Sequence, residues 1–257
     1  MPVLHHSVFG EGEPLVILHG LFGSGKNWQS LGRQFGQQLH VLNVDLRNHG
    51  QSFHTDSMNY PAMVDDVIVW LDSQDLQQIH LLGHSMGGKV AMMLAAMHPL
   101  RLNRLIVADI APVAYDHDYD DLIDPILDLP LAALDSREQA DQLLQASIPE
   151  ASLRAFLLQN LVREADSWRW RVNWPVIRRD IGQLTGFDGL EVDWRIDTPT
   201  LVIRGANSDY VGAAEIEIIK QHIPTAQIES VVDAGHWLHA EQPAAFQRLV
   251  LDFLFEA

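Results

Sequence analysis

The stretch "LLGHSMGGKVAMML", residues 81–94, decides the fold. A short apolar run ends in the pentapeptide GHSMG, and an apolar segment with helical spacing follows it, so a strand leads directly into a helix. In that context G-x-S-x-G is typical of a sharp turn that raises a serine hydroxyl above the sheet. The serine takes strained backbone angles there, and glycines on both sides leave it room. The stretch therefore predicts that Ser85 is a nucleophile, against the alternative of an ordinary turn with incidental glycines.

Short apolar runs alternate with helical patterns along most of the chain, which is typical of a mostly parallel sheet with helices on both faces. Most of these runs lead into loops rich in Gly, Asn, Asp or Ser. The predicted strands are "LVILH" (15–19), "HVLNVD" (40–45), "IHLLGH" (79–84), "RLIVADI" (104–110), "TLVIRG" (200–205) and "IESVVD" (228–233).

The alternation stops between residues 110 and 198, where helical patterns such as "DDLIDPILDL" and "EASLRAFLLQNLV" occur and no strand is expected. A loop of that length is improbable in a compact domain, so we expect an inserted helical cap. The sequence thus predicts one α/β domain with a core of residues 1–111 and 196–257 and a helical cap of residues 112–195, inserted before the last two strands.

The segment "VVDAGHWLHAEQP" places His236 in the loop after the last predicted strand. A base at that edge of the sheet can reach Ser85, and nucleophile, acid, base is the chain order in which hydrolases with this turn supply their catalytic groups. His239 is the nearest competitor. His84 adjoins the nucleophile, and we expect its ring to point away from Ser85.

The segment "HGLFGSGKNW", residues 19–28, supports two interpretations. It begins like a phosphate-binding P-loop, but Asn27 stands where a Ser or Thr would hold Mg²⁺. It also fits the loop that supplies one backbone amide to an oxyanion hole, the second amide coming from the residue after the nucleophile. We favour the second interpretation, with the amides of Leu21 and Met86 as donors and Phe22 as a pocket wall.

The acid that would orient His236 has two candidates. In "TLVIRGANSDYV" the position expected for it holds Ser208, with Asp209 one place later. Asp109 ends an earlier strand in "LIVADIAPV". Both loops approach the histidine, so position alone leaves the two aspartates equally good.

Composition excludes several classes of function. The 34 acidic and 17 basic residues give a formal net charge of −17, which repels polyanions, so nucleic acid is a poor partner. Cysteine is absent, which excludes disulfides, thiolate metal sites and a cysteine nucleophile. No leader pattern or membrane-spanning apolar run occurs, and we expect a cytoplasmic protein that is a monomer or a homodimer.

The predicted cap carries aromatic side chains and a basic patch. The aromatic and apolar residues either line an acyl groove or form the cap's own core; they are Trp168, Trp170, Trp174, Leu157, Leu158 and Phe187. The basic residues Arg169, Arg171, Arg178 and Arg179 suggest a hypothesis in which they bind an anionic substrate group, such as the phosphates of an acyl-CoA. In "DLRNHGQS" we expect Asp45, Arg47 and Asn48 to stabilise their own loop.

Taken in order, "HGLFGS", "DLRNHGQS", "NYPAM", "GHSMGGK", "DIAPV", "GANSDYV" and "GHWLHAE" make the chain resemble the α/β-hydrolase superfamily, most closely the bacterial YbfF-type esterases. The resemblance extends over almost the whole length and is weakest in the cap. It implies a serine carboxylesterase or thioesterase that hydrolyses small acyl esters or thioesters through an acyl-enzyme, without cofactor or metal.

The resemblance carries Ser85 over as the nucleophile and His236 as the base. It favours Asp109 as the acid, with Ser208 between acid and histidine, over Asp209 and Asp233. We expect the substrate pocket to include Phe22, His84, Trp168 and Trp237. The competing hypotheses are other chemistry on the same fold, such as carbon–carbon bond hydrolysis or perhydrolysis, and a non-catalytic small-molecule receptor.

Overall fold

A seven-stranded, mostly parallel sheet forms the centre of the protein in a computed structural model that describes residues 3–165, 167–190 and 193–255. The strand order is β1-β3-β2-β4-β5-β8-β9, and only β1 runs antiparallel to its neighbour. The strands are β1 (His6–Phe9), β2 (Pro14–Leu18), β3 (His40–Val44), β4 (Ile79–His84), β5 (Leu102–Ala108), β8 (Thr200–Gly205) and β9 (Gln227–Val231). The six predicted strands are present, whereas β1, a four-residue edge strand, is not predicted from the sequence.

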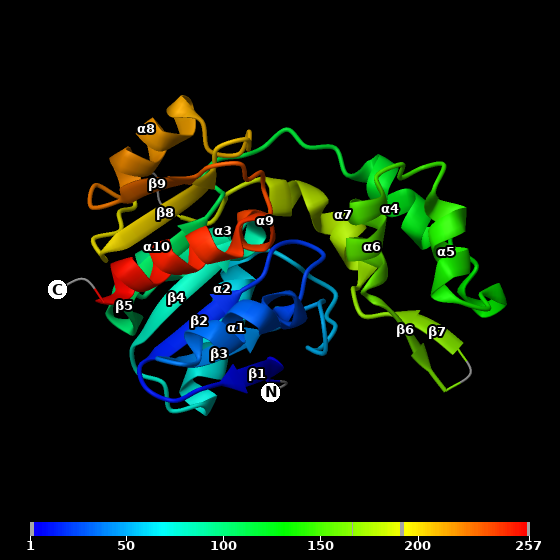
Figure 1. The fold of residues 1–257 in the computed structure, drawn as a ribbon, viewed down its shortest axis with the longest axis horizontal. Helices are drawn as coiled ribbons and strands as arrows, with labels where there is room; N and C mark the ends of the chain where they lie inside the picture. The colour runs from blue at the N-terminus through cyan, green and yellow to red at the C-terminus, as the bar shows by residue number, and fades with distance from the viewer. Residues whose placement is uncertain (1–2, 166, 191–192, 256–257) are drawn as a thin grey trace.

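Helices cover both faces of the sheet (Figure 1). On one face α1 (Gln29–Phe35) and α10 (Pro243–Phe255) pack side by side over the strands. On the other lie α2 (Tyr60–Ser73), α3 (Met86–Met97) and α8 (Ala213–His222). The short helix α9 (Leu238–Glu241) follows β9 and precedes α10. β4 is buried along its whole length, so the serine that follows it stands on a rigid central strand.

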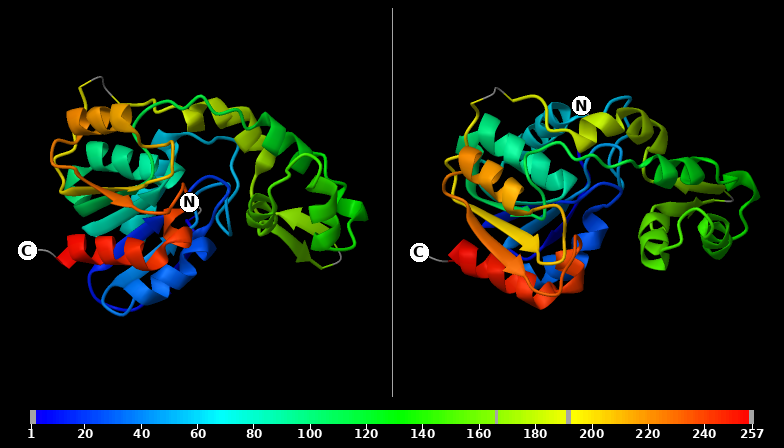
Figure 2. Two further views of the ribbon diagram at one scale, coloured as in Figure 1. Left: turned by 45° about the horizontal axis from the view of Figure 1, so that its top comes forward. Right: turned by 90° about the horizontal axis from the view of Figure 1, so that it is seen from above.

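The segment of residues 112–195, called the insertion below, lies between β5 and β8 and extends to one side of the sheet (Figure 2). Its helices are α4 (Asp120–Leu127), α5 (Arg137–Leu144), α6 (Ala151–Leu158) and α7 (Trp174–Thr185). It also contains an antiparallel pair, β6 (Leu161–Glu164) and β7 (Ser167–Trp170), where the sequence predicts no strand. Four-residue strands that pair only with each other give too short an alternation of apolar and polar residues to be recognised.

Candidate functional site

Ser85 stands on the sharp turn between β4 and α3, as predicted. Its backbone has φ 53° and ψ −121°, a left-handed conformation that is costly for any residue with a side chain. A Cβ atom on Gly83 would come within 2.2 Å of the carbonyl oxygen of Gly87, so the turn closes only with glycine there. The amide of Ser85 donates to the carbonyl of Ala108 at 3.0 Å and ties the turn to β5.

His236 connects Ser85 to Asp109. Its Nε2 lies 3.0 Å from the Ser85 Oγ, and its Nδ1 lies 2.8 Å from the Asp109 Oδ2. The ring stacks on Tyr210 with centroids 3.9 Å apart, which restricts its rotation. A hydroxyl, an imidazole and a buried carboxylate in this sequence of contacts have the geometry of a nucleophile, its base and the group that orients the base.

Asp109 follows β5 and is fully buried. Its Oδ1 accepts a hydrogen bond from the amide of Gly205 at 2.9 Å, and its Oδ2 accepts one from the Ser208 hydroxyl as well as from His236. Ser208 therefore lies beside the contact of Asp109 with His236, and the expectation that it stands between them is wrong. The side chains of Asp209 and Asp233 are exposed, and neither is hydrogen bonded to His236.

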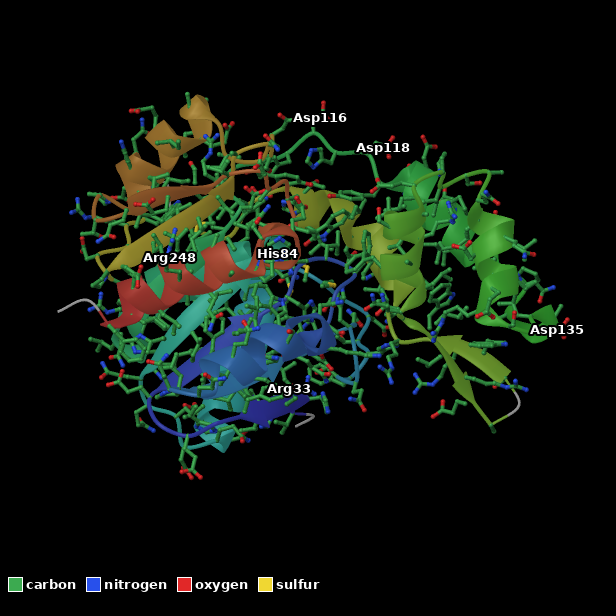
Figure 3. All side chains as sticks on the ribbon, viewed as in Figure 1. Arg33, His84, Asp116, Asp118, Asp135 and Arg248 are labelled. Atoms are coloured by element: carbon green, nitrogen blue, oxygen red, sulfur yellow. The ribbon has the colours of Figure 1, made fainter. Side chains whose placement is uncertain are left out.

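The other two histidines near the nucleophile have different partners. His84 donates from Nε2 to the backbone carbonyl of His236 at 2.8 Å, and Figure 3 shows it in the core, near the short helix α9. Its ring lines the cavity, as predicted, and burial lowers its pKa well below the usual value. His239 stacks on Trp28 with centroids 4.2 Å apart, and burial lowers its pKa to about 3. Neither ring contacts the Ser85 hydroxyl.

The loop after β2 presents its backbone toward Ser85. Within the described part of the chain the amides of Leu21 and Met86 have no acceptor, and both residues lie at the nucleophile, Leu21 in the cavity wall and Met86 next to Ser85 in sequence. Phe22 takes φ 63°, which turns the loop. Its amide donates to the Nε2 of His49 at 3.1 Å, and this bond fixes the loop so that the preceding amide stays free.

The insertion also holds this loop. Asn160 is buried, and its Nδ2 donates to the carbonyl oxygen of Phe22 at 2.8 Å. The Phe22 ring packs on Trp174 with centroids 4.9 Å apart. The position of the Leu21 amide thus depends on side chains from both the core and the insertion.

The hydrogen bond donated by the backbone amide of Gly25 excludes the P-loop interpretation of residues 19–28. Gly25 donates to the Asp45 Oδ1 at 2.6 Å, so the loop binds a carboxylate of the protein itself. Asp45 also accepts from the amide of Gln51. Arg47 pairs with Asp66, and the Asn48 side chain accepts from a backbone amide of the same loop. These three residues stabilise their loop, as expected.

We expect acid to destabilise the protein through His49. Burial lowers the pKa of His49 to about 3, while in the unfolded chain it is about 6.5. The unfolded state therefore binds a proton that the folded state does not, and stability is lost as the pH falls from about 6.5 toward 3. Between pH 7.5 and pH 5 this single histidine costs about 2 kcal/mol. In urea unfolding, the free energy of unfolding that His49→Gln loses between these two pH values should be smaller than the wild-type loss by about 2 kcal/mol.

The exposed His54 provides the control for that experiment, because its ring is not buried in the fold. His54→Gln should follow the wild-type pH dependence. If His49→Gln and His54→Gln lost stability equally between the two pH values, burial of a neutral His49 would not be the cause.

A cavity of about 270 Å³ opens on Ser85 and has a mostly apolar wall. Phe22 and Trp237 line it, as predicted, and so do Leu122, Leu153 and Phe156, which the sequence did not single out. Trp168 does not: its indole Nε1 donates to the carbonyl of Leu134 at 2.9 Å, so the prediction that it lines the pocket is wrong. Leu157 and Leu158 are buried in the core of the insertion instead. An open cavity beside the nucleophile with apolar walls can hold an acyl chain.

Three of the four arginines of the predicted basic patch are paired with carboxylates. Arg169 pairs with Glu164, Arg178 with Asp120 and Asp124, and Arg179 with Asp180. Sequence spacing gathers the arginines but does not reveal these pairings: the partner of Arg179 is the next residue in the chain, whereas that of Arg178 lies on α4. The hypothesis that these residues bind substrate phosphates is therefore wrong for Arg169, Arg178 and Arg179.

The described residues contain no group of three or more potential metal ligands and no helix that is long and apolar enough to cross a membrane.

One polar side chain near Ser85 was not recognised in the sequence. Lys89 lies one turn after Ser85 on α3 and is buried. The signal was a single charged residue within an otherwise apolar helix.

A serine on a strand-to-helix turn, with a histidine from the loop after the last strand and an aspartate after the strand next to β4, defines the alpha/beta hydrolase class. The chain belongs to that family: the family model described as "alpha/beta hydrolase fold" matches residues 13–243.

The chain is similar to several named esterases and lipases, which confirms the resemblance seen in its motifs. It is 35% identical to "Esterase YbfF" of Escherichia coli (strain K12) over 242 residues, covering 94% of this chain and 92% of that protein. It is 37% identical to "sn-1-specific diacylglycerol lipase ABHD11" of Xenopus laevis over 254 residues, covering 96% of this chain and 81% of that protein. The solved structure "Marine microorganism esterase" superposes with a TM-score of 0.94 at 37% identity, covering 98% of this chain and 100% of that one.

Proposed function

We propose that the protein is a serine carboxylic ester hydrolase that cleaves small acyl esters through a covalent acyl-enzyme. The observation that carries the proposal is the continuous contact from the Ser85 Oγ to His236 at 3.0 Å and from His236 to Asp109 at 2.8 Å. The names of its relatives, esterases and a lipase, agree with it.

In the proposed mechanism the Ser85 Oγ attacks the ester carbonyl carbon while His236 takes the hydroxyl proton at Nε2. The amides of Leu21 and Met86 donate to the oxyanion that forms, and α3 directs the positive end of its dipole to the same point. Asp109 stabilises the imidazolium through Nδ1–H. His236 then gives the proton to the leaving alcohol, and water, activated by the same imidazole, hydrolyses the acyl-enzyme.

The proposal assigns the cavity beside Ser85, called the large cavity below in contrast to a smaller compartment that adjoins it, to the apolar part of the substrate. At about 270 Å³ it is near the small end of ligand pockets, which favours short and medium acyl chains over long ones. In this assignment residues 1–111 and 196–257 carry the catalytic groups and residues 112–195 are a cap over them. Tyr119, Leu122, Leu153 and Phe156 are then the cap's contribution to the cavity wall.

The test is pre-steady-state hydrolysis of p-nitrophenyl esters from acetyl to palmitoyl. We expect a burst of p-nitrophenol close to one equivalent per chain, because the acyl-enzyme forms faster than it is hydrolysed, and the highest kcat/KM for short to medium chains. A fluorophosphonate should abolish turnover and add one adduct, on the peptide that contains Ser85.

An adduct on a different residue would contradict the proposed nucleophile. Of the competing hypotheses, non-catalytic ligand binding predicts no turnover of these simple esters, and carbon–carbon bond hydrolysis predicts faster turnover of a carbon–carbon substrate than of any of them. Perhydrolysis uses the same acyl-enzyme and predicts that hydrogen peroxide competes with water for it.

A further inference from the structure

A second, smaller compartment adjoins Ser85. Its volume is about 30 Å³, enough for about two water molecules or one carboxylate group. It shares Leu21, Ser85, Tyr119 and Tyr210 with the wall of the large cavity, so the two spaces meet at the nucleophile. A substrate held at Ser85 can therefore extend one arm into each space.

Lys89 lies in the wall of this compartment and is only 1% exposed. Its Nζ donates to the carbonyls of Thr185 at 2.9 Å and Gly186 at 2.7 Å, at the C-terminal end of α7. It also lies 4.9 Å from the centre of the Tyr115 ring and 5.7 Å from that of Tyr60. An ammonium has three N–H groups, so within the described part of the chain one N–H has no acceptor.

The charge of Lys89 is not paired. No carboxylate of the described residues forms a salt bridge with it, and Asp188 acts on it only at longer range. No Asp or Glu lines the compartment, in a protein with twice as many acidic as basic residues. Buried charges in proteins are normally paired, because desolvation is costly. A cation left unpaired beside the nucleophile has room for an anionic partner from outside the chain.

We propose that the compartment around Lys89 is a subsite for a carboxylate carried on a short arm of the ester. The inference rests on the proposed ester hydrolysis and adds a substrate class to it: the carboxylate belongs either to the acyl part, as in the half-ester of a short dicarboxylic acid, or to the alcohol part, as in the acyl ester of a hydroxy acid. The phenol rings of Tyr60 and Tyr115 form apolar walls around the ammonium, and the large cavity accepts the other arm.

The kinetic test compares each carboxylate substrate with its carboxamide, which has nearly the same size and no charge. Monomethyl succinate and methyl succinamate test the acyl arm, and acetoxyacetate and acetoxyacetamide test the alcohol arm. We expect kcat/KM to favour the carboxylate at least tenfold in one pair. In Lys89→Met that ratio should fall to about one. Equal rates on both members of both pairs in the wild type would overturn the subsite.

Lys89 also anchors α7, so a variant that loosens the same anchor is needed as a control. Tyr60 donates from its hydroxyl to the carbonyl of Leu184 at 2.6 Å, one residue before the first carbonyl that Lys89 binds. Tyr60→Phe removes that bond and keeps the cation, so the carboxylate preference should persist. If Lys89→Met and Tyr60→Phe slowed all four esters by a common factor, Lys89 would be an anchor and nothing more.

Binding to the Ser85→Ala variant separates this inference from the proposed function. NMR titration should give a Kd at least tenfold lower for monomethyl succinate or acetoxyacetate than for its amide, with the difference lost when Lys89→Met is added. That result without turnover in the wild type would leave the subsite standing and the ester hydrolase proposal wrong. Turnover in the wild type without any preference for the carboxylate would leave the ester hydrolase proposal standing and the subsite wrong.

The pH dependence of binding to the Ser85→Ala variant, in which Lys89 is intact, provides a test that does not depend on the folding of Lys89→Met. Burial lowers the pKa of Lys89 to about 7, partly opposed by Asp188. Tyr60, Tyr115 and Tyr210 face the compartment with pKa values raised by burial, so they stay neutral, and its other titratable groups besides Lys89 are His117 and Tyr119. Above pH 7 the empty site loses its charge, so the affinity for the carboxylate should fall at least tenfold between pH 7 and pH 9 while that for the amide does not change. A constant preference would overturn the proposal.

Discussion

Ser85→Ala is expected to lower kcat for p-nitrophenyl esters by about 10⁴- to 10⁶-fold and to remove the burst completely. The substitution deletes the only oxygen that lies within hydrogen-bonding distance of the His236 Nε2 among the described residues. The cavity, the free amides of Leu21 and Met86 and the histidine all persist, so a small residual rate from transition-state binding is expected. Stopped-flow absorbance measures both the burst and the residual rate.

The same variant tests the fold around the turn. Because the Ser85 hydroxyl forms no hydrogen bond within the described residues other than that with His236, alanine should leave the melting temperature within a few degrees of the wild type. Unchanged hydrolysis in a folded Ser85→Ala protein would mean that the strand-to-helix turn has no catalytic role, and a different nucleophile would have to be sought in the cavity wall.

Asp109→Asn is expected to lower kcat by about 10⁴-fold, with Asp209→Asn close to the wild type. The amide of asparagine offers an N–H where the carboxylate accepts a hydrogen bond from Nδ1–H, so the imidazole takes the wrong tautomer and its cation loses its counter-charge. Asp209 is exposed and makes no hydrogen bond to His236, so its loss removes nothing from the base. Steady-state kinetics of both variants on p-nitrophenyl acetate make the comparison.

Asp109 also accepts from Gly205 and Ser208, so the fold of Asp109→Asn needs its own measurement. Ser208→Ala removes one of these two bonds and keeps the contact of the carboxylate with His236, which provides the matched control. A rate loss in Ser208→Ala as large as that in Asp109→Asn would attribute the effect to the loop. A large loss in Asp209→Asn would contradict the assignment of the acid.

The position of Ser85, the proposed nucleophile, on its sharp turn was predictable because the signal is local. The glycines that make room for the turn and the strand and helix on either side of it lie within fourteen consecutive residues. His236 was predictable from chain order. The choice between Asp109 and Asp209 was not, because it depends on two neighbouring strands, β5 and β8, and on a backbone at Asp109 with φ 52° that turns its carboxylate toward the amide of Gly205.

Several features of the insertion could not be predicted from the sequence either, because they depend on contacts between residues that are far apart in the chain. Whether Trp168 faces the cavity or the core of the insertion depends on a partner, the carbonyl of Leu134, that lies 34 positions away. The neutralisation of Arg178 depends on α4 packing against α7. Periodicity identifies which segments are helical, but it does not say which of their side chains meet.

The bond from Asn160 to the carbonyl of Phe22 means that the insertion is more than a cover that sets the size of the cavity. An experiment that exchanges this segment between relatives assumes that the rest of the protein needs nothing from it. A transplanted segment would also have to bring an amide to the place of Asn160 and a flat ring to that of Trp174. Replacing the insertion would therefore change the support of the loop that carries Leu21 together with the wall of the cavity.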